Sequence, residues 1–194
     1  TLEALENVPR TFYDKAMLGL PGRDEQIENY QATIRNMAKA GIPTLGYNWM
    51  PNGVWRTPHA LGRGGVKVTS FDRAEVENAP LVAGINVIEA LDGRTLSHDE
   101  MWANYRYFTA AVVPVAEEVG LNLALHPDDP PVPELGGIAR LFDSSAGFKK
   151  ALEEIAPSPR HGMDFCMGCF SEMGENVIDA VRYFGERGKI FYVH

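Results

Sequence analysis

The stretch LNLALHPDDPP, residues 121–131, decides the fold of this chain. Its first residues form a short apolar run typical of a buried strand, and the run ends abruptly at His126, among two aspartates and three prolines. The same pattern recurs in HGMDFC, residues 161–166, and in KIFYVH, residues 189–194. About one strand-helix unit of chain separates successive ends. We therefore predict three consecutive strands that finish on His, Cys and His.

Helical patterns alternate with these strands. Apolar residues recur at three- and four-residue spacing after Asp24, a predicted N-cap, and a strand is expected over residues 42–48. Ser97 and Glu100 form a capping box that opens a second helix, in which Pro114 should produce a kink. Two further helices precede the last two strands. Alternation of this kind indicates a parallel sheet with functional residues at the carboxyl ends of its strands.

Two parallel architectures fit this element order. A doubly wound open sheet would spread the strand ends along a line, whereas a (β/α)8 TIM barrel turns them toward one axis, and we prefer the barrel. A complete barrel needs about 250 residues. The 194 residues of this chain, whose two ends both read as cut, are therefore expected to form a single partial barrel domain over residues 1–194. Residues 51–96 lack a sustained period and predict a lid-like insertion, with a short helix near residues 73–78.

The composition limits the classes of partner. The chain is 45% hydrophobic and 23% charged, as in ordinary globular domains, and its formal net charge is -8. An acidic surface argues against nucleic acid and against an anionic membrane, which both attract basic proteins. No run approaches the roughly 18 apolar residues of a membrane span, and no secretory signal pattern opens the chain. We expect a cytoplasmic protein with a small-molecule ligand.

The three strand ends offer a set of metal ligands. His126, Cys166 and His194 occupy equivalent points of successive units, and imidazole and thiolate bind divalent transition metals well. Each residue alone has an ordinary alternative, as a hydrogen-bonded rim histidine or a small core thiol. Cys166 and Cys169 also have the spacing of a redox dithiol. We favour this less, because a dithiol opens a helix directly after its strand and residues 170–174 intervene here; Cys169 then has no role in the site.

Other polar residues are candidates for substrate binding. Asn48 ends an earlier strand, Asp128 and Asp129 follow His126, and Arg56 and Arg140 could pair with an anionic group of the substrate. The alternatives are that the aspartates cap a turn before the prolines, that Asn48 ends its strand by a side-chain turn, and that the arginines are solvated surface residues.

Several of these strings closely resemble the mannonate dehydratase family. The similarity spans nearly the whole chain, and its specific part is HPDDPP. The resemblance implies a xylose-isomerase-like TIM barrel and a manganese or ferrous ion held by His126, Cys166, His194 and a later Asp. That Asp and the neighbouring acid/base residues have no counterpart before the chain stops, so the catalytic base is expected beyond His194. The matching strings lie at residues 29–30, 47–51, 125–131, 136–140, 165–168 and 190–194.

The activity implied by the resemblance is a lyase reaction. D-mannonate would lose water to give 2-dehydro-3-deoxy-D-gluconate in glucuronate catabolism, with the sugar acid as partner and a homo-oligomer as an allowed assembly. Two alternatives stay open. One is a metal-dependent sugar isomerase or epimerase of the same fold, which would act on neutral sugars, and the other is a non-catalytic truncated paralogue.

Overall fold

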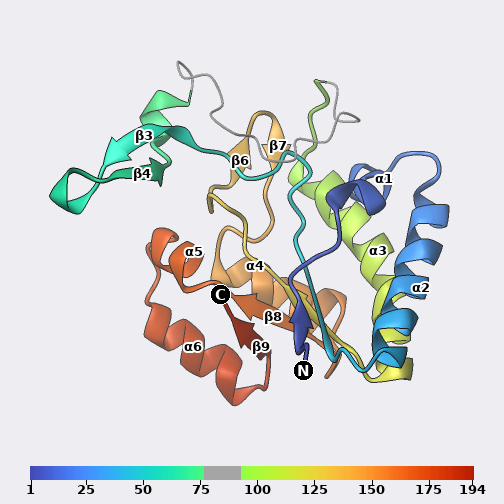
Figure 1. Ribbon diagram of the computed structural model, residues 1–194. Helices are drawn as coiled ribbons and strands as arrows, with labels where there is room; N and C mark the ends of the chain where they lie inside the picture. The colour runs from blue at the N-terminus through green and yellow to red at the C-terminus, as the bar shows by residue number, and fades with distance from the viewer. Residues whose placement is uncertain (77–92) are drawn as a thin grey trace.

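The computed structural model describes residues 1–76 and 93–194, and its centre is a curled parallel sheet (Figure 1). Every strand pairs in parallel with the strand that precedes it in the sheet, and the order in space follows the order in the chain. A doubly wound sheet would reverse its order at a switch point, so this topology confirms the predicted barrel, of which the chain forms a part. The five strands are β1 (Ala4–Leu5), β2 (Thr44–Tyr47), β5 (Asn122–Leu125), β8 (His161–Phe165) and β9 (Ile190–Val193).

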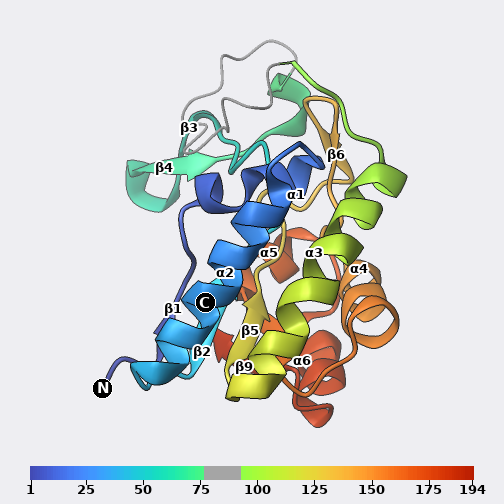
Figure 2. The same cartoon turned by 90° about the vertical axis from the view of Figure 1, so that its right-hand side faces the viewer.

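The helices cover the outer face of the sheet. Helices α2 (Arg23–Lys39) and α3 (His98–Val119) lie side by side, as Figures 1 and 2 both show. The remaining helical elements between strands are α4 (Ser145–Lys149), the π-helical segment η5 (Lys150–Ile155), α5 (Met167–Glu172) and α6 (Val177–Glu186).

Alternate strand residues separate the two faces of the sheet. The larger apolar side chains of each strand belong to the core shared with the helices: Leu45, Tyr47, Leu123, Leu125, Met163 and Phe165. Because successive side chains of a strand point to opposite faces, the residues between them line the inner face. Three of the inner-facing residues are small, namely Gly46, Ala124 and Gly162, and the fourth, between Met163 and Phe165, is Asp164. A Cβ atom at Gly46 would lie 2.3 Å from the Tyr192 hydroxyl, so the absence of a side chain there makes room for a residue of β9.

Local signals account for the helix boundaries. The capping box of Ser97 and Glu100 is present at the start of α3, and Gly120 ends this helix in a left-handed conformation. Helix α3 continues through Pro114 as one element. The predicted N-cap of α2 was wrong by two residues: Gly22 is the N-cap, and Asp24 lies in the first turn, where its charge complements the helix dipole.

The segment after β2 contains more regular structure than its sequence indicated. Strands β3 (Thr57–Leu61) and β4 (Lys67–Ser70) form an antiparallel hairpin, with the 3-10 turn η2 (Arg63–Gly65) at its tip, and Figure 1 shows this hairpin projecting from the body. A 3-10 turn, η3 (Arg73–Glu75), stands within the expected short helix; residues 77 and 78 of that helix and 77–92 of the expected lid lie outside the described residues.

Short elements also stand in the loops of the barrel. The segment between β1 and α2 holds the 3-10 turn η1 (Arg10–Phe12) and the helix α1 (Asp14–Leu18). A second hairpin, β6 (Glu134–Leu135) with β7 (Ile138–Ala139), turns at Gly136 and Gly137, both with positive φ. Within the described part of the chain, no helix is both long and apolar enough to cross a membrane.

Candidate metal centre

A cavity of about 240 Å³ lies at the carboxyl ends of the parallel strands. In a parallel α/β barrel this is the end at which active sites form. Residues from several elements that are far apart in sequence border it. Those that matter for the chemistry are Arg10, Asn48, His126, Asp129, Cys166 and His194.

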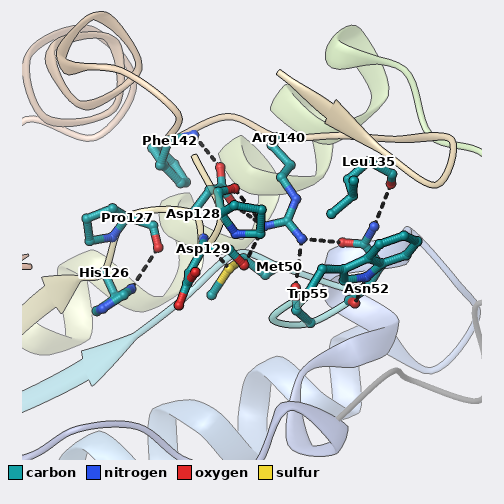
Figure 3. Close-up of polar contacts among 12 residues, drawn as sticks. Met50, Asn52, Trp55, His126, Pro127, Asp128, Asp129, Leu135, Arg140 and Phe142 are labelled. Carbon is teal, nitrogen blue, oxygen red and sulfur yellow. Dashed lines mark hydrogen bonds and ion pairs between the residues drawn. The ribbon is translucent and has the colours of Figure 1, made fainter. Parts of the chain in front are cut away.

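His126 follows β5 and has one ring nitrogen anchored by the backbone. Its Nδ1 lies 2.7 Å from the carbonyl oxygen of Pro127 (Figure 3). Because a carbonyl oxygen only accepts, we assign a proton to Nδ1, so Nε2 is the nitrogen that can bind a metal ion once it has lost any proton of its own. Burial lowers the pKa of His126, but the adjacent Cys166 sulfur and Asp164 carboxylate outweigh it and raise the pKa above its ordinary value.

Cys166 follows β8 directly and is the N-cap of α5. The Cys169 thiol, and then the two imidazoles of His126 and His194, hydrogen-bond to its sulfur and lower the pKa of Cys166 against the opposing effect of burial. The same contact with Cys166 raises the pKa of Cys169. These two directions favour the thiolate, which is the form that binds metals, at Cys166 over Cys169.

His194 completes the group that the sequence predicted. Its ring centroid is 5.4 Å from that of His126, and its contact with the Cys166 sulfur raises the pKa of His194. The structure thus brings the three strand ends to one cavity. It also adds Cys169, because a ring nitrogen of His126 and the two cysteine sulfurs all lie within 4.8 Å of one another. Imidazole nitrogen and thiolate sulfur form a donor set suited to a divalent transition metal.

A carboxylate lies beneath these donors. Asp164 occupies the inner face two residues before Cys166, and it is fully shielded from solvent. Burial raises the pKa of Asp164, whereas His126 and the nearby Tyr192 hydroxyl oppose this effect. Neither carboxylate oxygen makes a hydrogen bond of good geometry with the described residues.

Asn48 and Arg56, two of the predicted substrate-binding residues, lie near the cavity in different ways. Asn48 lines it, and its buried Oδ1 has no hydrogen-bond partner among the described residues. Arg56 instead makes a bidentate ion pair with Asp129, with its two terminal nitrogens 2.6 and 2.7 Å from the carboxylate oxygens. This pair, rather than Arg56 alone, stands at the cavity wall.

Asp128 and Arg140 are placed away from the cavity. Both side chains are buried, with Nη1 of Arg140 3.6 Å from Oδ1 of Asp128 (Figure 3). Arg140 also donates to the carbonyl oxygen of Gly53 at 2.7 Å and to Asn52, while Asp128 accepts from the backbone N–H of Phe142. Burial raises the pKa of Asp128 to about 6, although Arg140 opposes the shift. The pair joins the HPDDPP loop to the start of the segment after β2.

Two charged residues that line the cavity, Glu6 and Arg10, were not predicted from the sequence. Arg10 is 8% exposed, borders the cavity and donates from Nη1 to the carbonyl oxygen of Met50 at 3.0 Å. It precedes the short helix α1 in a segment without periodicity, so no pattern pointed to it. The helix α5 was also missed: it begins at Met167, immediately after Cys166, and this corrects the reason for which we disfavoured a paired role for the two cysteines.

The curled parallel sheet and the ligand-type side chains at its strand ends define part of a (β/α)8 barrel with a candidate metal centre. More particularly, the chain belongs to the D-mannonate dehydratase (UxuA) family, whose model matches residues 1–194.

Individual proteins that are similar to this chain are also mannonate dehydratases. Mannonate dehydratase 2 of Halalkalibacterium halodurans is 32% identical over 215 residues, and the mannonate dehydratase of Thermotoga petrophila is 34% identical over 218. Each alignment covers 100% of this chain, which spans 60% and 59% of the two relatives' lengths, respectively.

Two solved structures have a similar fold. The crystal structure of mannonate dehydratase from Streptococcus suis serotype 2 superposes with a TM-score of 0.83 at 29% identity, covering 100% of this chain and 55% of that one. A putative sugar phosphate isomerase/epimerase from Anabaena variabilis has a TM-score of 0.55 at 19% identity, covering 96% of this chain and 48% of that one. This second likeness shows the shared fold alone.

Proposed function

We propose that this protein is a metal-dependent dehydratase that converts D-mannonate into 2-dehydro-3-deoxy-D-gluconate and water. The observation that carries the proposal is the meeting of His126, Cys166 and His194 at one cavity of a mannonate dehydratase family chain. The relatives named above are mannonate dehydratases, and this chain spans about 60% of their length.

The reaction makes two demands on the site. A weakly acidic proton must leave the carbon next to the carboxylate, and hydroxide, a poor leaving group, must leave the following carbon. A divalent cation, Mn²⁺ or Fe²⁺, held by His126, Cys166 and His194 would stabilise the negative charge that develops on the substrate oxygens. The bond between Nδ1 of His126 and Pro127 supports this role, because it holds the imidazole in the tautomer that a metal requires.

The chain's own polar groups would bind and orient the sugar acid. The buried Oδ1 of Asn48 can accept a hydrogen bond from a substrate hydroxyl group, which would satisfy an atom that otherwise has no partner in the described structure. Arg10 supplies a positive charge at the cavity for the carboxylate, and Arg56, whose charge is balanced by the cavity-lining Asp129, would add hydrogen bonds to the substrate. We propose that Asp128 and Arg140 act indirectly, by holding the loop that carries His126 and Asp129.

We propose that the protein acts on a small sugar acid, in glucuronate breakdown, in the cytoplasm. The acidic composition supports a small-molecule ligand over nucleic acid.

The test is formation of a 2-keto acid from D-mannonate by the purified full-length protein. Mn²⁺, or Fe²⁺ under anaerobic conditions, is supplied, and a chelator-treated sample serves as the control. We expect product only with the metal, and none from neutral ketoses, which an isomerase or epimerase would convert. Conversion of ketoses without any action on mannonate, or no product despite measured metal binding, would overturn the proposal.

A further inference from the structure

Cys169 lies in the short helix α5, whose N-cap is the proposed metal ligand Cys166. Residues three apart share a face of a helix, so Cys169 in α5 and Cys166 at its N-cap direct their sulfurs to one side. Both sulfurs and a ring nitrogen of His126 lie within 4.8 Å of one another. Tetrahedral coordination with metal–sulfur bonds of about 2.3 Å needs donors about 3.8 Å apart, so only small movements separate this group from a coordination shell.

The two thiols are buried and are not joined by a disulfide. Cys166 is 8% exposed and Cys169 is 4% exposed, and both are free cysteines. Metal ions bind thiolates and displace the protons of thiols, so an ion between two free cysteine sulfurs would have to break only S–H bonds.

A second donor group around Cys169 is less available. Asp129 and Glu172 also lie within 4.8 Å of the Cys169 sulfur and of each other. However, Arg56 engages both oxygens of Asp129, at 2.6 and 2.7 Å, and Glu172 is exposed to solvent. A cation there would have to break the ion pair, whereas an ion at the nitrogen and sulfur group would displace only a thiol proton. The available donors are therefore the soft ones.

We propose that Cys169 is an additional metal ligand, and that soft divalent ions such as Zn²⁺ bind this chain through His126, Cys166 and Cys169 together. The inference deepens the proposed function, with which it shares His126 and Cys166. Thiolates favour Zn²⁺, whereas Mn²⁺ prefers oxygen donors, so Cys169 makes the site discriminate between the two ions. His194 borders the same cavity and can supply a fourth donor, and four protein ligands would leave no open position for a substrate. The zinc form is then a closed, inactive form.

Cobalt substitution tests the number of thiolate ligands directly. Co²⁺ is added to the reduced, metal-free protein under anaerobic conditions, and the near-ultraviolet thiolate-to-cobalt charge-transfer absorption is measured per bound ion. With two thiolate ligands, wild-type absorption should be about twice that of Cys169→Ser and of Cys166→Ser. A serine at position 169 can still donate a hydrogen bond to Cys166. Equal absorption of the wild type and Cys169→Ser would therefore show that Cys169 is only a hydrogen-bond donor, and would overturn the proposal.

A comparison of two ions separates ligation from general damage. Zn²⁺ and Mn²⁺ affinities are measured by competition with a chromophoric chelator for the wild type, Cys169→Ser and Cys169→Ala. We expect the substitutions to weaken Zn²⁺ binding by at least about tenfold and Mn²⁺ binding by less than about threefold. Equal weakening of both ions would contradict the inference. These measurements use no mannonate, so a failure of the dehydratase assay would leave them intact, and their failure would leave the dehydratase proposal standing.

Discussion

His126 and His161 stand on neighbouring strands but on opposite faces of the sheet. His161, at the start of β8, is fully buried on the helix side; its Nδ1 lies 2.9 Å from the carbonyl oxygen of Ala156, and its Nε2 accepts from the Tyr47 hydroxyl at 2.7 Å. His126 engages only Nδ1 with the backbone and borders the cavity. A histidine with both nitrogens satisfied by the protein is a structural residue, whereas one with a nitrogen left over at a cavity can bind a metal.

Two arginine–aspartate pairs also differ in burial, one inside the protein and one at the cavity. Asp128 pairs with Arg140 inside the protein, where the two side chains are 0% and 1% exposed. Asp129, the next residue, pairs with Arg56 at the cavity wall, where 19% and 27% of the two side chains are exposed. Adjacent aspartates in one motif therefore lie in different environments, Asp128 inside the protein and Asp129 at the cavity.

The largest expected effect concerns the buried pair of Arg140 and Asp128. Arg140→Ala leaves the Asp128 carboxylate buried without its partner and should lower the free energy of unfolding by about 3–5 kcal/mol. Arg56→Ala, the matched control at the cavity wall, should cost about 1 kcal/mol or less. Urea denaturation followed by circular dichroism measures both. Equal losses in the two variants would remove the distinction between the pairs.

Acid should lower the stability of the fold through His161, which is fully buried. Burial lowers the pKa of His161 to about 4, and the neighbouring Lys189 charge contributes, whereas the hydrogen bond to Ala156 opposes the shift. An unfolded histidine titrates near 6.5, so between these values the unfolded chain binds more protons, and stability falls as the pH falls from about 6.5 to 4. The loss from this residue should approach about 3 kcal/mol. Unfolding of the wild type and His161→Gln across this pH range tests it, and parallel curves would contradict it.

Metal binding should depend on the cavity-facing histidine only. His126→Ala removes a proposed ligand and should raise the Mn²⁺ dissociation constant by about 100-fold or more, equivalent to roughly 2.7 kcal/mol. His161→Gln, on the other face, should leave it within about threefold of the wild type, because no nitrogen of His161 borders the cavity. Metal titration of the two purified variants decides the matter. A comparable loss in both would show that the effect is structural.

The smallest expected effect concerns the exposed pair and rests on the proposed function. Arg56→Ala should lower kcat/KM for D-mannonate by about tenfold, mainly through KM, because it removes a cation from the wall of the cavity. Arg56→Lys should recover part of this loss, since it restores the charge without the bidentate geometry. An unchanged KM in Arg56→Ala would mean that Arg56 only holds Asp129.

The features predicted correctly from the sequence are those that local patterns encode. The apolar run before His126 identifies a buried strand, and the capping box at Ser97 identifies the start of a helix; both signals lie within a few residues of the feature they specify. The alternation of such elements predicted a parallel sheet, and the His, Cys and His at three successive strand ends favoured the barrel over an open sheet. The meeting of the three strand ends in one cavity then follows from the parallel order of the strands.

The features that could not be predicted depend on packing between distant segments. Nothing in the aspartate pair of HPDDPP indicates that Asp128 points to Arg140 and Asp129 to Arg56, since both arginines come from other parts of the chain. Arg10 reaches the cavity through the path of a nonperiodic segment. Cys169 becomes a neighbour of His126 because a six-residue helix, too short to show a period, starts directly after β8.

The agreement between spatial order and chain order in the sheet also has a consequence for biosynthesis. Each strand after β1 pairs with the strand made before it, so its template has already left the ribosome when it emerges. Strands appear at intervals of seconds during translation at about 5–20 residues per second, which is longer than the elementary steps of helix and loop formation. The sheet can therefore grow at one edge in the direction of synthesis, and the cavity would take shape last, when the segment carrying His194 joins those carrying His126 and Cys166.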